Sequence, residues 1–548
     1  MRAGTGACTS IFSLTDRPIG FTICTVLVHE HNKGGQYMAL LLGIDIGTSG
    51  TKTVLFDADA ADAAAAKASA TIEYPLYQPK NGWAEQDPAD WWHAVCGTIR
   101  QVIAKSGCNP ADIKGVGLSG QMHGLVMLDK NGAVLRKSII WCDQRTAKEC
   151  EEITAKVGSE RLIQITANPA LTGFTASKIL WVRNNEPDVY GKCAHILLPK
   201  DYIRYMLTGE FATEVSDASG MQLLDVPGRN WSDEVISKLD IDRSLLAKVY
   251  ESPEITGTVT AQAAELTGLA AGTPVAGGAG DNAAAAVGTG TVCDGRAFTT
   301  LGTSGVVFAH TSKLSIDPKG RVHTFCCAVP GAWHVMGVTQ GAGLSLKWFR
   351  DNFCHEEMAA ADGMGVDPYY LMDKQAARIP IGCDRLLYLP YLMGERTPHL
   401  DPDCRGVFFG LSAMHTRQHL LRAVMEGVTY SQRDSVEVLK EMGVHIDTML
   451  ACGGGGTSPL WRQMLADVYG VPVSTVVSKE GPALGVAILA GTGVGIYKSV
   501  QEGCDAVIRT NPAQNPVAAD SAAYQPYYAL YRKLYPALRD TYKELAKI

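Results

Sequence analysis

At 548 residues the chain is longer than a single hydrophobic core usually supports, so two domains are expected. Apolar residues make up 46% of it, as in ordinary globular proteins, and the formal net charge is −7 without a long run of either sign. These properties argue against a nucleic acid or an anionic membrane as a partner. No uninterrupted apolar stretch reaches membrane-spanning length.

Cysteine and histidine spacing gives little sign of a disulfide framework or a metal site. The 15 cysteines include no C-x-x-C pair. Their odd number in so large a chain predicts free thiols in a reducing, cytoplasmic setting. His415 and His419 lie four residues apart, as two zinc ligands on a helix can, but their Thr-Arg-Gln spacer lacks a catalytic glutamate. With no third ligand nearby, we expect no metal there.

The first 37 residues need separate treatment. The apolar run Phe21–Val28 is too short to span a membrane and is followed by polar residues without a small-residue cleavage site. Lys33-Gly34-Gly35 can be encoded by a purine-rich ribosome-binding sequence just upstream of Met38. We therefore expect translation to begin at Met38, with residues 1–37 a non-native or disordered extension; the intact mass of the product of the native gene would test this.

The first elements that the pattern predicts are two strands and a helix. Apolar, strand-forming runs at 39–46 and 52–56 flank the turn Gly47-Thr48-Ser49-Gly50-Thr51, which predicts a hairpin. Asp87 is the expected N-cap of a helix that begins at Pro88 and continues through Ile103. Further strands are expected at 116–118, 124–128 and 133–135, the last two joined by an Asn-Gly turn, and helices around 178–184 and 200–207.

The middle of the chain repeats the first hairpin. Gly-Thr-Ser-Gly occurs at 47–50 and again at 302–305, each time between strand formers, and this predicts two related halves. Before the second copy, a glycine stretch at 277–280 leads into Asp281-Asn282 and an alanine-rich helix that ends near Gly288. The last third predicts a helix at 420–439, a strand into 452–456, a helix at 458–469, a strand at 471–477 and a helix at 524–548.

Three glycine-rich loops, at 47–50, 302–305 and 453–456, are candidate phosphate cradles, because their backbone N–H groups can approach an anion closely. A plain turn is the alternative for each. The familiar nucleotide motifs do not fit: Thr51 stands where a P-loop needs glycine before the lysine. Residues 115–120 satisfy the dinucleotide fingerprint, but no helix is predicted to follow it. The protein-kinase sequences His-Arg-Asp and Asp-Phe-Gly are absent.

Phosphoryl transfer needs a carboxylate to take the hydroxyl proton and anionic groups near a metal ion. Asp281 follows the glycine stretch and opens a helix, so it is a candidate base; a simple N-cap is the alternative. Asp45, at the end of the first strand, suits a Mg²⁺ site through water, with a turn aspartate as the alternative. His123, in a loop after a strand, could meet a sugar hydroxyl or be a structural hydrogen-bonding residue. For Asp143 and Arg145, beside Trp141, a surface ion pair is the default.

Several segments together resemble the FGGY carbohydrate kinases, from about Leu41 to at least Leu489. The matching segments are GIDIGTSGTK (43–52), WAEQDP (83–88), GLSGQMHG (117–124), WCDQR (141–145), LLPKDYIRYMLTGE (197–210), AGDNAAAAVG (279–288), LGTSG (301–305), LPYLMGERTPH (389–399) and GVFFGLSAMHTRQHLLRAVMEG (406–427). WAEQDP and GQMHG distinguish the ketopentose kinases of the family from its glycerol kinases. Cys142 stands where relatives commonly have asparagine.

The resemblance implies an α/β fold of two actin-like (ribonuclease-H-like) domains with a catalytic cleft between them, a sugar-binding domain at 38–281 and a nucleotide-binding domain at 282–548. Asp281 is the implied general base on the sugar 5-hydroxyl, and Asp45 the catalytic aspartate near Mg²⁺. The implied sugar contacts are Met122, His123, Asp281 and Asn282, and the implied ATP contacts are Thr48, Gly302, Thr303, Gly454, Gly455 and Ser458.

The expected activity is therefore ATP- and Mg²⁺-dependent phosphorylation of D-xylulose to D-xylulose 5-phosphate, in xylose catabolism. A kinase of another ketose or polyol such as ribulose is the alternative. An actin-like nucleotide-binding protein without a sugar substrate is a further one, and it would turn over ATP independently of sugar. A homodimer is possible by analogy with similar kinases.

Overall fold

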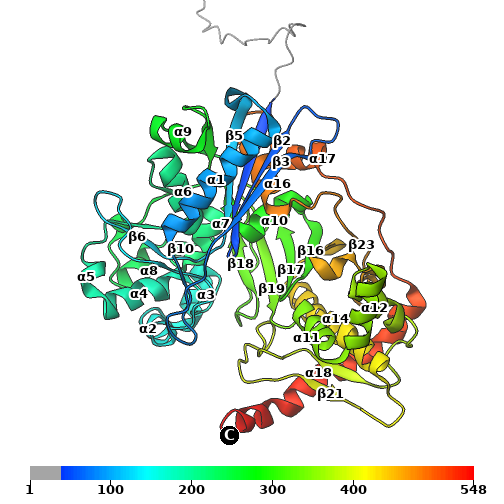
Figure 1. Ribbon diagram of the computed structural model, residues 1–548. Helices are drawn as coiled ribbons and strands as arrows, with labels where there is room; N and C mark the ends of the chain where they lie inside the picture. The colour runs from blue at the N-terminus through cyan, green and yellow to red at the C-terminus, as the bar shows by residue number, and fades with distance from the viewer. Residues whose placement is uncertain (1–38) are drawn as a thin grey trace, which may run out of the picture. The chain divides into compact units, whose positions relative to one another are not determined.

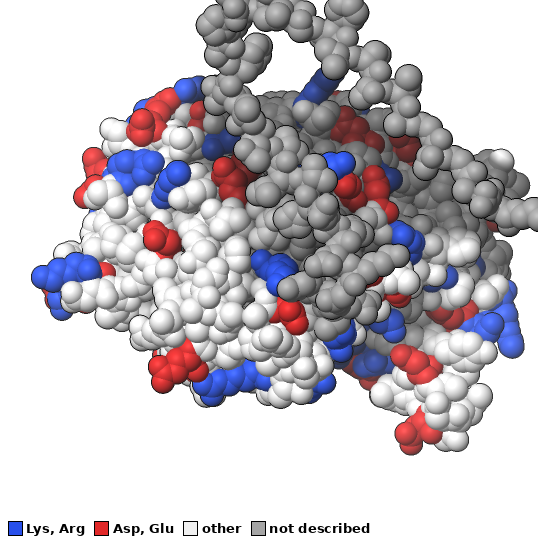
Figure 2. Space-filling model, turned by 90° about the horizontal axis from the view of Figure 1, so that it is seen from above, with Lys and Arg blue, Asp and Glu red and all other residues white. Residues whose placement is uncertain are grey.

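The computed structural model describes residues 39–548, which contain two main sheets (Figure 1). The hypothesis about residues 1–37 lies outside the described residues. Among residues 39–548, no helix combines the length and the apolar character needed to cross a membrane. On the face shown in Figure 2, acidic and basic side chains are interspersed among uncharged ones.

The first sheet is built on the predicted hairpin. Its order is β13 (Ile255–Thr258), β14 (Pro274–Ala276), β5 (Ile113–Gly120), β1 (Leu40–Ile46), β2 (Gly50–Asp57) and β3 (Ala66–Glu73), with β15 (Ala279–Gly280) pairing the end of β5. Strands β1, β2 and β3 are antiparallel, whereas β5, β14 and β15 run parallel to β1 or to one another. The carboxyl ends of β1, β5 and β15 therefore meet at one edge.

The second sheet repeats this arrangement. Its order is β18 (His323–Cys326), β19 (Trp333–Thr339), β17 (Gly305–Thr311), β16 (Gly295–Leu301), β22 (Ile446–Cys452) and β23 (Val473–Ser474). Here β16, β17 and β19 form the antiparallel meander, and β22 and β23 are the parallel strands. Without the edge strands β13 and β18, the two orders correspond strand by strand: β3-β2-β1-β5-β14 in the first sheet and β19-β17-β16-β22-β23 in the second. This common order, 3-2-1-4-5 when the five strands of each sheet are numbered along the chain, confirms the predicted pair of related halves and the actin-like fold.

Two helices from distant parts of the chain lie between the sheets (Figure 1): α10 (Asp281–Thr289) and α16 (Gly481–Gly493). Side chains alternate along a strand, so Leu41, Gly43 and Asp45 point to one face of β1. That face is the one α16 covers, because a Cβ on Gly43 would lie 1.9 Å from the carbonyl oxygen of Ala483. Toward the second sheet, α10 packs Ala286 against Phe298 and Phe308.

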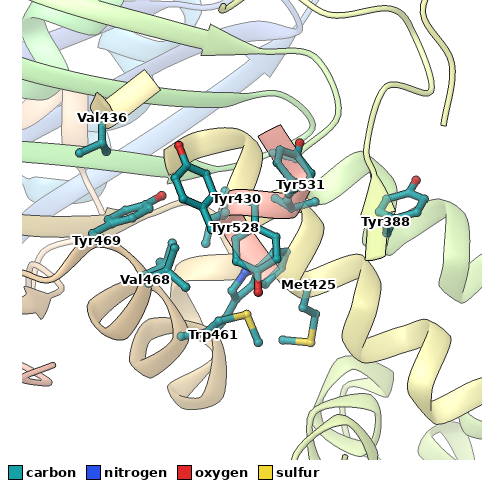
Figure 3. Packing of buried hydrophobic residues seen from close by; sticks show 14 of the residues in the cluster. Tyr388, Met425, Tyr430, Val436, Trp461, Val468, Tyr469, Tyr528 and Tyr531 are labelled. Atoms are coloured by element: carbon teal, nitrogen blue, oxygen red, sulfur yellow. The ribbon is translucent and has the colours of Figure 1, made fainter. Parts of the chain in front are cut away.

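The outer faces of both sheets carry the larger cores. Helix α1 (Pro88–Ser106) covers the first sheet with Trp91, Val95 and Ile99. As predicted, Asp87 caps α1 by accepting a hydrogen bond from the Ala89 N–H at 3.0 Å. The second sheet is covered by a cluster in which tyrosines of α14 and α18 pack around a tryptophan of α15 (Figure 3).

The remaining helices surround these layers. In the first half they are α2 (Ala147–Val157), α3 (Ser159–Thr166), α4 (Thr175–Asn185), α5 (Pro187–Tyr190), α6 (Pro199–Thr208), α7 (Val215–Ala218), α8 (Asp233–Lys238) and α9 (Ala261–Thr267). In the second half they are α11 (Gly343–Phe353), α12 (His355–Met364), α13 (Pro368–Ala376), α14 (Arg417–Glu441), α15 (Pro459–Tyr469), α17 (Val500–Val507) and α18 (Ala518–Leu545). Short strand pairs are β4 (Glu85–Gln86) with β7 (Ser138–Ile139), β6 (Val126–Leu128) with β8 (His195–Leu197), β9 (Ala212–Glu214) with β12 (Lys248–Tyr250), β10 (Leu224–Asp225) with β11 (Asn230–Trp231), and β20 (Leu387–Leu389) with β21 (Val407–Phe409).

Two predicted strands are wrong in extent. Residues 133–135 form only an isolated bridge, Val134 to Leu128, because the Asn131-Gly132 turn returns the chain for a single pairing. The strand predicted at 471–477 is limited to Val473–Ser474 in sheet pairing. The 115–120 segment lies within strand β5, which confirms that it is not a dinucleotide loop followed by a helix.

Candidate active site

Asp45 lies at the carboxyl edge of the first sheet, one residue before the end of β1. The parallel register places Ser119 of β5 beside it, and the Ser119 hydroxyl donates a hydrogen bond to Asp45 Oδ1 at 2.8 Å. On the other side, the antiparallel register places Lys52 of β2 opposite Asp45. The strand pairing, rather than a local turn, therefore sets the position of this carboxylate.

Asp281 reaches the same edge from the next strand. Gly280 ends β15 opposite Gly120, the residue after Ser119, and Asp281 is the first residue of α10. Its side chain does not cap the helix; Gly280 is the N-cap, and Asp281 Oδ1 accepts from the backbone N–H of Asn282 at 2.7 Å and from Asn282 Nδ2 at 2.9 Å. The alternative of a simple N-cap is therefore wrong, and the carboxylate is oriented by Asn282 instead.

Both carboxyls have raised pKa values, and the charge of Asp45 contributes to the shift of Asp281. Burial and, next, the negative charge of Asp45 raise the pKa of Asp281 to about 7. Burial also raises the pKa of Asp45, against the lowering effects of the Ser119 hydrogen bond and the Lys52 charge. Two partly buried carboxyls at one sheet edge, one of them titrating near neutrality, form a typical acid–base site.

Met122 and His123 follow β5 and contact different segments. Met122 is buried, and a Cβ on Gly280 would lie 2.9 Å from Met122 Cγ, so Met122 packs directly on the backbone before Asp281. His123 Nδ1 lies 2.8 Å from the carbonyl oxygen of Gly220. Asn282 follows Asp281 at the start of α10. The structure thus brings Met122 close to the backbone next to Asp281, the candidate base.

The hydrogen bond of His123 defines its tautomer. A carbonyl oxygen can only accept, so Nδ1 must carry the proton. Burial, followed by the charge of Lys178, lowers the pKa of His123 to about 3, which keeps the ring neutral. Nε2 is then an unprotonated acceptor, and it has no hydrogen-bond partner within residues 39–548. Such a nitrogen suits a donating hydroxyl.

Gln86 links three of the sequence segments that point to the family. Its Nε2 donates to the carbonyl oxygen of Thr48 at 2.7 Å, and its Oε1 accepts from Gln121 Nε2 at 2.7 Å. Trp141 Nε1 also donates to Thr48 Oγ1 at 2.9 Å. Hydrogen bonds from Gln86 and Trp141 therefore fix the first glycine turn, at Thr48, to the rest of the first half.

The expected surface ion pair of Asp143 and Arg145 is wrong. Both side chains are buried, with 0% and 1% of their surface exposed. Arg145 donates to both carboxylate oxygens of Asp143, and its guanidinium lies 3.7 Å from the ring centroid of Trp83. The nearby segment WAEQDP, through Trp83 and Ala84, closes over the pair and excludes the water that a surface pair would meet.

The nucleotide candidates of the second half gather around the duplicated turn. Gly453 has φ 76°, and a Cβ there would lie 3.1 Å from the backbone of Leu301 and 3.2 Å from Gly302 N. Only glycine allows this approach, which sets the loop before α15 against the β16–β17 turn. Thr303 and Gly454 are exposed beside it, and a Cβ on Gly454 would meet no atom within 4 Å. The open space next to bare backbone is what a phosphate cradle requires.

Ser458 has a structural task in this loop. Its hydroxyl accepts from the Trp461 N–H at 3.0 Å and so caps α15. Glycine backbone followed by a capped helix start also offers an anion the N-terminal end of a helix dipole.

The donor set at the sheet edge fits a hydrated Mg²⁺ ion. Asp45 and Asp281 each use Oδ1 for a hydrogen bond, and Oδ2 of each has no hydrogen-bond partner within residues 39–548. No group of three or more His, Cys, Asp and Glu side chains in that range could hold a metal by itself. Mg²⁺ commonly binds through one or two carboxylates together with water and substrate phosphates, so this partial set suits it.

Comparison with known proteins agrees with the fold. Residues 40–288 match the N-terminal domain, and residues 297–494 the C-terminal domain, of the FGGY family of carbohydrate kinases. The chain belongs to this family. It is 38% identical over 503 residues to the xylulose kinase of Bacillus subtilis, covering 92% of this chain and 98% of the relative. It is 39% identical over 503 residues to the xylulose kinase of Escherichia coli, covering 91% and 99%.

The fold comparison extends to a solved structure. A crystal structure of xylulose kinase from Rhodospirillum rubrum matches with a TM-score of 0.84 at 31% identity, covering 92% of this chain and all of that one. The expected family and fold are therefore confirmed.

Sequence reasoning missed several residues that support the site. Ser119, which holds Asp45, is a lone hydroxyl in an apolar strand, and the parallel register that pairs the two becomes visible only in the fold. Lys178 is fully buried, and the one sequence feature that could have indicated this is its position directly before the apolar run Ile-Leu-Trp-Val. Phe174, which packs on His123 at a ring-centroid distance of 4.7 Å, gave no signal at all.

Proposed function

We propose that this chain phosphorylates the 5-hydroxyl of D-xylulose with ATP to give D-xylulose 5-phosphate. The position of Asp281 carries the reaction type: its carboxyl lies at the edge where β1, β5 and β15 end, with a pKa of about 7. The xylulose kinases of B. subtilis and E. coli, similar over nearly their whole length, support the sugar.

In this proposal residues 38–281 supply the sugar-binding domain and residues 282–548 the nucleotide-binding domain. His123 Nε2 accepts a hydrogen bond from a sugar hydroxyl, and Met122 packs beside the backbone that leads to Asp281. Asn282 donates to Asp281 Oδ1, which orients the carboxylate and leaves Oδ2 free to take the proton of the attacking hydroxyl. Asp45, as the second carboxylate, would hold Mg²⁺ through water.

ATP, when bound, supplies the phosphoryl group, and Mg²⁺ neutralises the charge of its phosphates. The backbone of Gly302, Gly454 and Gly455 would hold the nucleotide in the second half, with the hydroxyl groups of Thr303 and Ser458 nearby and Thr48 facing it from the first half. Closure of the two halves would exclude water, which otherwise competes with the sugar as acceptor.

The experiment is ATP-to-ADP conversion with D-xylulose, D-ribulose, glycerol or no sugar, for the wild type, Asp281→Asn and the matched control Asp233→Asn. Asp233 is the first residue of α8, as Asp281 is of α10, but it is exposed. We expect strong stimulation by xylulose and a loss of about 10²- to 10⁴-fold in kcat in Asp281→Asn alone.

The wild-type kcat/KM should also rise with pH as Asp281 loses its proton. An Asp281→Asn variant with undiminished kcat would contradict the role of the base. Preference for ribulose or glycerol would contradict the substrate, and ATP turnover independent of sugar would favour a nucleotide-binding protein without a sugar substrate.

A further inference from the structure

Lys178 is a buried cation next to the candidate sugar site. It lies in the first turn of α4, and its side chain is fully buried. Its ammonium group donates to the carbonyl oxygen of His123 at 2.9 Å and to that of Gly173 at 2.7 Å. No carboxylate within residues 39–548 forms an ion pair with it, and burial lowers its pKa to about 7. The negative charge of Asp143 favours the ammonium form, but burial outweighs it, and burying an ammonium without an ion pair costs stability, so the two carbonyl contacts require an explanation.

The carbonyl that Lys178 contacts belongs to a residue in an unusual conformation. His123 has φ 69°, in the left-handed region that non-glycine residues seldom adopt. A second donor, Thr175 Oγ1, reaches the same carbonyl oxygen at 3.1 Å. Two side chains from the start of α4 thus fix one peptide group, and an observed strain of this kind tends to mark a functional position.

The same helix start also holds the imidazole ring. Phe174, the residue just before α4, packs on the ring of His123 with centroids 4.7 Å apart. The bond from Nδ1 to the carbonyl oxygen of Gly220 holds the ring from its other end. If the His123 carbonyl were released, the backbone could relax to a common conformation, and Nε2 would lose its direction.

We propose that Lys178 is a positioning residue for sugar recognition, in which its ammonium holds the His123 carbonyl and thereby aims His123 Nε2 at a hydroxyl of the sugar. This inference rests on the proposed function. It assigns no chemical step to Lys178, which acts on the sugar only through His123.

The test is a double-mutant cycle between Lys178→Met and His123→Ala, read as KM for xylulose, KM for ATP and kcat. Methionine keeps most of the volume and removes the donor. We expect Lys178→Met to raise the xylulose KM about tenfold or more, with the ATP KM nearly unchanged. In the His123→Ala background the same substitution should change the xylulose KM less than about twofold, because the residue through which it acts is gone.

Two further variants keep the test decisive. Thr175→Val removes the second donor to the same carbonyl, so it should raise the xylulose KM by a smaller factor, about threefold. This effect should disappear in the His123→Ala background. Thr175→Val takes the place of Lys178→Met in the cycle if the Lys178→Met protein does not fold. Ser177→Ala is the matched control: Ser177 is a buried hydroxyl of α4 that bonds to the Thr146 hydroxyl and to the backbone carbonyls of Leu171 and Phe174, and not to His123. It should leave the xylulose KM unchanged.

Equal effects of Lys178→Met with and without His123 would overturn the proposal, as would an equal rise in the KM for ATP. These outcomes differ from failure of the proposed function, in which the wild type itself would show no stimulation by xylulose.

Discussion

Asp281 occupies a position that the folded protein maintains at a cost near neutral pH. An ordinary aspartate has a pKa of 3.8, whereas burial and Asp45 raise the pKa of Asp281 to about 7 in the folded chain. Between these two values the folded chain holds a proton that the unfolded chain has released. By linkage, the stability that this group contributes falls as the pH rises from about 4 to about 7. A residue that costs stability yet is held by Asn282 is a mark of function rather than of folding.

Asp281→Asn should therefore stabilise the protein at alkaline pH. We expect the free energy of unfolding at pH 8 to exceed that of the wild type by on the order of 2 kcal/mol, less than the full pKa shift would give because the residue is partly exposed and water screens its charge. The gain should disappear below about pH 4, where Asp281 is protonated in both the folded and the unfolded wild type. Urea titrations at several pH values measure it, with Asp233→Asn as the control. An Asp281→Asn protein less stable than wild type at pH 8 would refute the electrostatic argument.

At the residue scale, the sequence could indicate groups whose neighbours along the chain define their setting. Asp45 and Asp281 stand at a strand end and a helix start beside glycine, and those patterns are local. Asp143 and Arg145 were misjudged because their burial depends on Trp83, some 60 positions away, closing over them. The contact from Lys178 to His123 joins residues 55 positions apart and has no local signature either.

At the scale of elements, the contact between α10 and α16 depends on the absence of side chains. A Cβ on Gly485 would lie 1.9 Å from the carbonyl oxygen of Ala284, and a Cβ on Gly288 would lie 1.9 Å from that of Gly481. Helix backbones that approach so closely leave no room for a methyl group. The hairpins and capped helices were predictable from local patterns, but the position of α16 was not. Its residues are apolar on all sides, so its sequence does not indicate which element it packs against, and the sheet it covers is formed by the other end of the chain.

Gly485→Ala should reverse the usual effect of alanine in a helix. Helix propensity alone predicts a gain of about 1 kcal/mol, but the collision with Ala284 must push the helices apart, at a cost of roughly 1–3 kcal/mol or more. We expect a lower free energy of unfolding by urea denaturation. Gly481→Ala is the matched control in the same helix, because a Cβ there would meet no atom within 4 Å. Equal stability of the two variants would show that the helices are not closely packed.

At the scale of the whole described chain, the residues of the candidate site come from both halves. Asp45, Met122 and His123 belong to the first half, whereas the glycine loops at 302–303 and 453–455 belong to the second. The halves meet through α10 and α16 and through an aromatic contact, Phe174 with Phe325, whose ring centroids are 6.1 Å apart. The repeated Gly-Thr-Ser-Gly predicted the duplication and the family resemblance the division into two domains, whereas the contacts between the halves required the fold.

Because each substrate is expected to bind mainly to one half, each should prepare the molecule for the other. If xylulose binding favours closure, it brings the glycine loops nearer to Asp281. The free-energy cost of ordering the site when a nucleotide binds is then smaller. Coupling between two sites is commonly about 5- to 150-fold, and it must be reciprocal. We expect xylulose to tighten the binding of a non-hydrolysable ATP analogue about tenfold, and the analogue to tighten xylulose by the same factor.

Calorimetric titration of each ligand, with and without saturating amounts of the other, measures this coupling, and glycerol in place of xylulose serves as the control. Gly485→Ala, which disturbs the contact between α10 and α16, should weaken the coupling more than it weakens either ligand alone. Independent dissociation constants in the wild type would mean that the two halves bind their substrates without closing, and the exclusion of water would then have to come from the sugar pocket itself.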